Sequence, residues 1–106
     1  MFVAQVEGGR PVGLVAGIQA PDGDGAELVS MWVAPEWRGR GAASPLIEAV
    51  RQWAARSGFH QLGLWVVEGN VIAEKAYAKA GFGRTGRRQP VREGEAPMEF
   101  EMARRP

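Results

Sequence analysis

The 106-residue chain contains no cysteine and only one histidine, His60. Without cysteine there can be no disulfide framework, no thiol nucleophile and no thiolate ligand for a metal. A single histidine leaves too few nitrogen ligands for a metal site, so we expect none. Thirteen basic and twelve acidic side chains give a net charge of +1, which provides no electrostatic case for binding nucleic acid.

Long apolar segments are missing as well. No apolar run approaches the roughly 18 residues of a membrane span, and the first residues lack the layout of a secretory signal. We therefore expect a cytoplasmic protein that has no membrane partner. With 45% hydrophobic residues the chain can bury one small core, which predicts a single domain over residues 1–106.

Apolar periodicity predicts an α/β fold in the order β-β-β-α-β-α-β-β, a mixed and mostly antiparallel twisted sheet with two helices. The strands are expected over Phe2–Val6, Val12–Ile18, Glu27–Val33, Gln61–Val67, Phe82–Gln89 and Met98–Met102. Glycines in residues 7–10 predict a hairpin turn between the first two strands. The apolar run of residues 64–67 predicts a strand that is buried on both faces.

Two segments have the spacing of amphipathic helices. The first follows a Gly-rich turn and runs to about Ser57, with Leu46, Val50 and Trp53 on one face. The second begins after Asn70, whose side chain can cap the helix, and ends at Ala80.

The turn before the first helix, residues 33–43 (VAPEWRGRGAA), is the most informative segment. A strand, a Gly-rich turn and a helix in succession bring free main-chain N–H groups and the positive end of the helix to one place, which suits a phosphate. Glycine allows the main chain to approach a ligand closely, and Arg38 and Arg40 add positive charge. The alternative is an ordinary connecting loop with solvated arginines.

Two common phosphate loops fit this turn poorly. A Walker A loop ends in Gly-Lys-Ser or Gly-Lys-Thr, and the chain contains neither. A dinucleotide fingerprint could begin at Gly39, but Ser44 stands where its third glycine belongs and no carboxylate lies near position 60. A Rossmann-type nucleotide-binding module is therefore a distant alternative.

A third known phosphate-binding loop fits this turn better. The pattern Arg38-x-x-Gly41-x-Ala43 resembles the acetyl-CoA pyrophosphate loop of the GNAT superfamily of N-acetyltransferases. Residues 70–82 resemble that superfamily's N-x-x-A-x-x-x-Y-x-x-x-G-F element at every landmark position. The resemblance extends over about residues 2–102. It implies transfer of an acetyl group from acetyl-CoA to a primary amine of a small molecule or peptide.

The resemblance also implies roles for particular residues. The parallel strands 27–33 and 61–67 would splay and admit the pantetheine arm of the cofactor. Glu27 would be the base that deprotonates the amine, and Tyr77 would give a proton to the departing thiolate; a surface carboxylate and a core tyrosine are the alternatives. The residues expected to bind the cofactor are Met31, Trp32, Val33, Arg38, Gly39, Arg40, Gly41, Ala42, Ala43, Asn70 and Tyr77.

One departure from the superfamily affects the expected partners. Its members normally have a strand and one or two helices before the first hairpin, and those helices form a wall of the acceptor site. Here the hairpin begins at residue 2. Either the N-terminal part is missing from this sequence, or the wall comes from elsewhere and a partner subunit could supply it, which predicts a homodimer or an exchange of C-terminal strands. The open edge of strand 2–6 also favours association. A non-catalytic acyl-CoA-binding domain is the remaining alternative.

Overall fold

The structure is a computed structural model that describes residues 2–5, 11–21, 23, 25–94 and 96–106, with only the main chain of residues 2–5 and 11. Its elements are β1 (Phe2–Gln5), β2 (Pro11–Gln19), β3 (Ala26–Val33), a 3-10 turn (Pro35–Trp37), α1 (Ala43–Arg56), β4 (Leu62–Val67), α2 (Val71–Lys79), β5 (Gly83–Pro90) and β6 (Met98–Arg104). The expected element order is confirmed. The expected hairpin turn over residues 7–10 lies outside the described residues.

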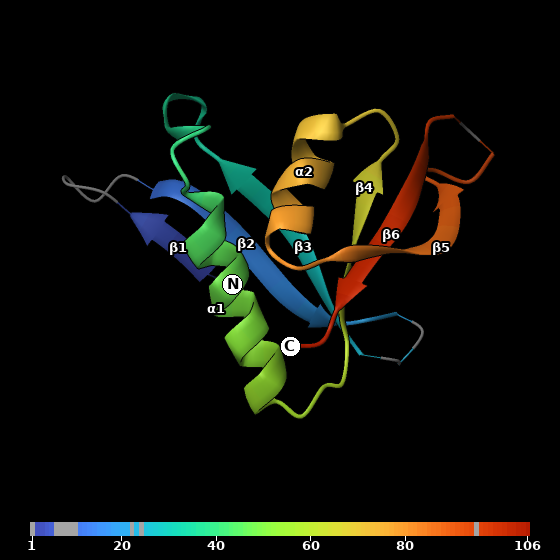
Figure 1. The fold of residues 1–106 in the computed structure, drawn as a ribbon, viewed down its shortest axis with the longest axis horizontal. Coiled ribbons are helices and arrows are strands. Elements are labelled where there is room, and N and C mark those ends of the chain that lie inside the picture. Colours follow the sequence, from blue (N-terminus) through green and yellow to red (C-terminus); the bar gives the residue numbers. More distant parts are fainter. Residues whose placement is uncertain (1, 6–10, 22, 24, 95) are drawn as a thin grey trace.

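Six strands form one sheet in the order β1-β2-β3-β4-β6-β5 (Figure 1). Among the described strands, only β3 and β4 pair in parallel, and the other four pairings are antiparallel. The sheet is therefore mixed and mostly antiparallel, as expected. Strand β6 lies between β4 and β5 although it comes last in the chain, so the C-terminal hairpin adds to the sheet through its second strand.

Helix α1 lies across β1, β2 and β3 because its apolar residues share one face. Leu46, Ile47, Val50 and Ala54 on that face are all buried. The helix ends at Arg56 in a Schellman arrangement, in which the Gly58 and Phe59 N–H groups donate to Ala55 and Ala54. Gly58 has a φ of 83°, which explains the glycine at this position.

Helix α2 begins as the sequence predicts. The Asn70 Oδ1 atom accepts a hydrogen bond of 3.2 Å from the Ala73 N–H group, which is one of the otherwise unpaired donors of the first turn. Two ion pairs tie this region to β5: Glu74 accepts from Arg84, and Glu68 accepts from Arg88. The N-terminal part of α2 and the turn before it are thus tied to the C-terminal hairpin.

Both helices pack on the same face of the sheet, and one cluster of buried residues joins them to it (Figure 1). The opposite face carries no helix in the described part of the chain. This explains why the expectation of two buried faces for residues 64–67 is wrong in part. Leu64 and Val66 are buried beneath the helices, but Trp65 is half-buried and Val67 is 39% exposed on the other face.

Strands β3 and β4 pair only at their beginnings. Ala26 is opposite Leu62 and Glu27 is opposite Gly63, and no further rung follows. Beyond these two rungs the strands diverge and leave a wedge that opens toward their carboxyl ends (Figure 1). The splayed pair that the resemblance implied is therefore present.

A bulge in β3 lies beside the wedge. The register with β2 shifts between Leu14 and Ala16, and Ser30 has a φ of 58°. Before the bulge, Ala26 and Leu28 face the core; after it, Met31 and Val33 pack against the core. The extra residue therefore changes which side chains of β3 line the wedge.

Candidate active site

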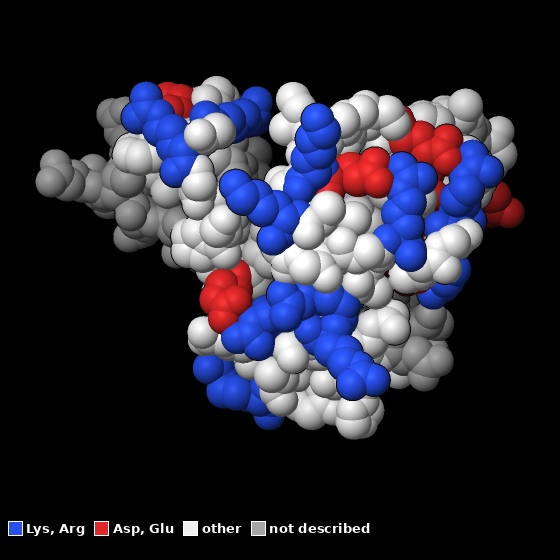
Figure 2. Space-filling view, viewed as in Figure 1, with Lys and Arg blue, Asp and Glu red and all other residues white. Residues whose placement is uncertain are grey.

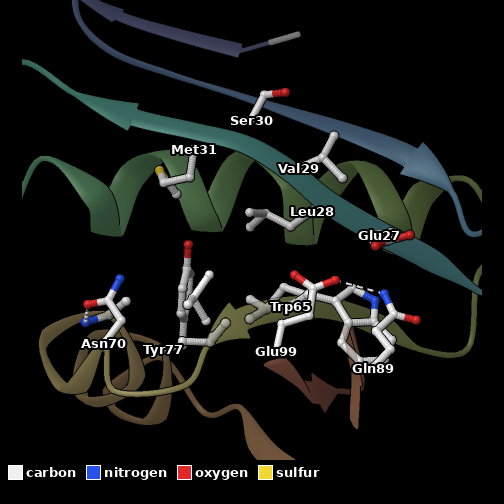
Figure 3. A pocket seen from close by; sticks show the side chains of 14 residues that line it. Glu27, Leu28, Val29, Ser30, Met31, Trp65, Asn70, Tyr77, Gln89 and Glu99 are labelled. Carbon is white, nitrogen blue, oxygen red and sulfur yellow. Dashed lines mark hydrogen bonds between the residues drawn. The ribbon is translucent and has the colours of Figure 1, made fainter. Parts of the chain in front are cut away.

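A cavity of about 560 Å³ occupies the wedge between β3 and β4, and we call it the strand cavity. Its walls are residues 27–31 of β3, residues 64–67 of β4, Asn70, Ala73 and Tyr77 at α2, and Gln89 and Glu99 of the C-terminal hairpin. Four predicted site residues, Glu27 and Met31 of β3, Asn70 and Tyr77, are thus brought to one cavity. Figure 3 shows Asn70 toward one end, Glu27 toward the other, and Tyr77 between them.

The Tyr77 side chain combines a packed ring with an accessible hydroxyl. The ring contacts Phe82 edge to face, with the centroids 5.9 Å apart. The hydroxyl points toward β3 (Figure 3) and has no hydrogen-bond partner among the described residues, yet it is not a buried unsatisfied atom. It is therefore available to a molecule in the strand cavity. Burial of the ring raises the pKa of Tyr77 above its ordinary value near 10, so the phenol keeps its proton at neutral pH.

A second cavity, of about 610 Å³, lies between the Gly-rich turn and α2, and we call it the loop cavity. It is lined by Val33, Trp37, Arg38, Gly39, Gly41, Ala42, Ala43, Ser44, Ile47, Ile72, Ala76, Lys79 and Ala80. Six predicted cofactor residues are on this list. Helix α2 separates the two cavities: Ala73 and Tyr77 face the strand cavity, while Ile72 and Ala76 face the loop cavity. An elongated molecule lying along α2 could occupy both.

The Gly-rich turn has the geometry of an anion site. Gly39 and Gly41 have φ values of 77° and 79°, which other residues rarely adopt. Within the described residues, the N–H groups of Gly39, Gly41 and Ala42 donate to no main-chain oxygen. They lie where the α1 dipole is positive. Cβ atoms at either glycine would meet nothing within 4 Å, so the space beside the main chain is open.

The two arginines of the turn hold it in place. Arg38 Nε donates to the Val33 carbonyl oxygen at the end of β3, at 3.0 Å. The Arg40 guanidinium lies over the Trp37 ring, 5.3 Å from its centroid. Arg38 lines the loop cavity, whereas Arg40 and Trp32 line neither cavity, and the Trp32 side chain is 40% exposed on β3.

The two cavities differ in charge. Among the described residues, the loop cavity is lined by Arg38 and Lys79 and by no carboxylate. The strand cavity is lined by Glu27 and Glu99 and by no basic side chain. Basic side chains flank both sides of the hollow between the Gly-rich turn and α2 (Figure 2). One cavity therefore suits an anion, and the adjoining one suits a cation.

Sequence reasoning missed Glu99 and Gln89 as site residues. Gln89 Nε2 donates to Glu99 Oε1 at 2.7 Å, and both side chains line the strand cavity (Figure 3). The strand that carries Glu99 was expected, but its position beside β4 was not. No signal in the sequence indicated that β6 would be inserted between β4 and β5.

Residues 1–82 match the model of the acetyltransferase (GNAT) family. The chain belongs to the GNAT family. Its sheet order and mostly antiparallel pairing also differ from a doubly wound parallel sheet, so nothing supports the Rossmann alternative.

Relatives by sequence agree with GNAT membership. An uncharacterized N-acetyltransferase of Mycobacterium tuberculosis, Rv2669, is 38% identical over 80 residues, which are 76% of this chain and 51% of that protein. An uncharacterized N-acetyltransferase of Bacillus subtilis, YobR, is 38% identical over 61 residues, 58% of this chain and 24% of that protein. The chain thus spans about half the length, or less, of the curated relatives it matches.

Solved structures agree with the GNAT fold. Nourseothricin acetyltransferase superposes with a TM-score of 0.83 at 27% identity, over 95% of this chain and 61% of that one. A Bacillus anthracis protein assigned as a streptothricin acetyltransferase, solved in complex with acetyl coenzyme A, has a TM-score of 0.80 at 19% identity, over 94% of this chain and 58% of that one. Among the described residues, no helix is long and apolar enough to cross a bilayer.

Proposed function

We propose that this GNAT chain transfers the acetyl group of acetyl-CoA to a primary amine. The observation that carries the proposal is the two-rung pairing of β3 and β4, because it opens a cavity through the sheet beside the Tyr77 hydroxyl. The loop cavity and its free N–H groups supply a site for the pyrophosphate of the cofactor. The acetyl-CoA complex of the Bacillus anthracis neighbour is consistent with this use of the fold.

The residues fit the cofactor in chemical type. Gly39, Gly41, Ala42 and Ala43 offer main-chain N–H groups to phosphate oxygens, and Arg38 adds positive charge at the same cavity. Met31 and Val33 give the wedge an apolar wall for the pantetheine arm. Asn70 lies at the same cavity as Tyr77 and presents a carboxamide there.

Acetyl transfer changes the charge of both reactants. The acceptor ammonium loses one proton before attack and a second as the amide forms, while the C–N bond forms and the C–S bond breaks. The departing thiolate takes up one proton, so one proton in total is released. Glu27 accepts the first proton, directly or through water, and the Tyr77 hydroxyl provides the proton for the thiolate and regains it from solvent.

A non-catalytic acyl-CoA-binding domain is the alternative against which acetyl transfer is tested. The test combines two measurements on the same protein. Thermal unfolding with and without acetyl-CoA reports cofactor binding, and release of free thiol with a panel of primary amines reports transfer. Acetyl-CoA-dependent stabilisation without thiol release from any amine would favour the binding domain. Neither stabilisation nor thiol release would reject both.

A further inference from the structure

We propose that Glu99 binds a second positive charge on the acceptor, so that the preferred acceptors are diamines and related dications. The inference rests on the proposed acetyl transfer and names the class of amine that the strand cavity selects. It starts from the position of Glu99 on β6, where it is opposite Val67 in one ladder and opposite Gln89 in the other. These pairings direct its side chain into the strand cavity from the side opposite to β3 (Figure 3).

The Glu99 carboxylate is fixed but not neutralised. Gln89 holds Oε1 at 2.7 Å, which leaves Oε2 for another partner. Among the described residues, no Lys, Arg or His forms an ion pair with Glu99. Glu101, two residues along the same face of β6, provides a contrast because it accepts from Thr85 at 2.7 Å and from Arg87 at 3.2 Å.

A half-buried carboxylate with no counterion is costly unless a cation reaches it, because burial removes part of its hydration. The strand cavity contains no basic side chain among the described residues, so a cation that reaches Glu99 from within it would belong to a ligand. The Trp65 ring lines the same cavity, but the Arg87 guanidinium already lies over it, 5.5 Å from its centroid, so Glu99 is the group there that is open to a ligand cation.

The cation at Glu99 is not the reacting nitrogen. A carboxylate in contact with an ammonium favours its charged form, whereas attack on the thioester requires the neutral amine. Glu99 therefore suits a charge that stays on the acceptor throughout the reaction. A smaller hollow of about 170 Å³ shares Glu27, Trp65 and Gln89 with the strand cavity. Arg87 also lines it, so it suits an uncharged part of the acceptor rather than its second cation.

The test compares diaminobutane with n-butylamine, which share a reacting amine and differ in the second charge. We expect the wild-type protein to use diaminobutane with the higher kcat/KM. Glu99→Gln should raise KM for diaminobutane by about tenfold to a hundredfold, the size expected when a hydrogen bond between charged groups is lost. Its kinetics with n-butylamine should change little. Glu68→Gln, which removes an exposed carboxylate paired with Arg88, is the matched control and should keep the wild-type preference.

A second readout does not depend on turnover. In CoA-saturated protein, diaminobutane should raise the thermal midpoint, n-butylamine should not, and Glu99→Gln should abolish the shift. A Glu99→Gln variant with an unchanged preference and an unchanged shift would overturn the assignment, and Glu99 would then be only a cross-strand partner of Gln89. Equal responses of the wild type to both amines would also overturn it while leaving acetyl transfer intact. Loss of thiol release with every amine would instead contradict the proposed function.

Discussion

At the scale of single residues, Tyr77 has the most distinctive environment. Its ring is held by packing against Phe82, while its hydroxyl reaches a cavity in which no described side chain bonds to it. A core tyrosine would have its hydroxyl satisfied by a neighbour. The arrangement is that of a hydroxyl whose hydrogen-bond partner is a bound ligand.

Replacing Tyr77 with Phe keeps the ring and removes only the hydroxyl. If the hydroxyl protonates the thiolate, kcat should fall by about 10²–10⁴-fold, the usual contribution of general acid catalysis. Acetyl-CoA affinity should stay within a few-fold, because the lost interaction is made only in the transition state. Steady-state kinetics with a cofactor titration would check both. Unchanged kcat in a reaction limited by chemistry would mean that solvent protonates the thiolate.

Glu27 is a separate case because its proposed role depends on pH. The Glu27→Gln variant cannot accept a proton from the ammonium, so its rate should drop most at low pH, where nearly all of the amine is protonated. As the pH rises toward the pKa of the amine, the variant should approach the wild type. The pH profile of kcat/KM measures this. Parallel profiles for variant and wild type would assign deprotonation to water or to another group.

At the scale of elements, the Gly-rich turn depends on main-chain conformation more than on side chains. Gly41 has a φ of 79°, and a Cβ there would project into open space at the loop cavity. A ligand that binds the N–H groups of the turn must enter that space. A bulky residue at position 41 would therefore both strain the main chain and block the ligand.

Gly41→Val should remove most of the stabilisation by CoA. For the wild type, a ligand at 100 times its dissociation constant stabilises the folded state by about 2.7 kcal/mol. Gly94→Val is the matched control, because Gly94 has a φ of 78° and an equally open Cβ position but lines neither cavity. Both variants should unfold at a lower temperature than the wild type without ligand. A full CoA shift in a folded Gly41→Val protein would contradict the phosphate assignment.

The sequence predicted those elements whose signals are local. The apolar spacing of α1, the Asn70 cap and the strand patterns all appeared at the expected places, because each depends on residues within a few positions of one another. The bulge at Ser30 was missed, since serine carries no preference for a positive φ that would identify it. Glu99 was missed because its place in the site depends on strand order, which is set by packing between distant segments.

At the scale of the whole molecule, the two edges of the sheet differ. Strand β5 has only exposed residues, is rich in arginine and is interrupted by an irregularity around Gly86, features that disfavour pairing with another chain. Strand β1 lies at the other edge and pairs with β2 on one side only among the described strands. The face opposite the helices is also uncovered in the described part of the chain.

We therefore expect the protein to form a homodimer, through the β1 edge or by exchange of C-terminal strands. Light scattering across a wide range of protein concentrations would measure the mass of the particle. Thiol release measured at the same concentrations would show whether activity follows association. A monomer that retains acetyl transfer throughout that range would contradict this expectation.

The short ladder between β3 and β4 also has a consequence for how fast main-chain hydrogens exchange with solvent. Only two rungs join the half of the sheet that carries α1 to the half that carries α2, so the inner edges beyond Glu27 and Gly63 have no partner strand to protect them. Their N–H groups should exchange with deuterium at temperatures well below the thermal midpoint of unfolding, while those of the β4–β6 ladder remain protected. Acetyl-CoA bound in the wedge should slow this exchange on both edges together, as a strand lying between them would. Mass spectrometry of the β3 and β4 peptides would measure this protection.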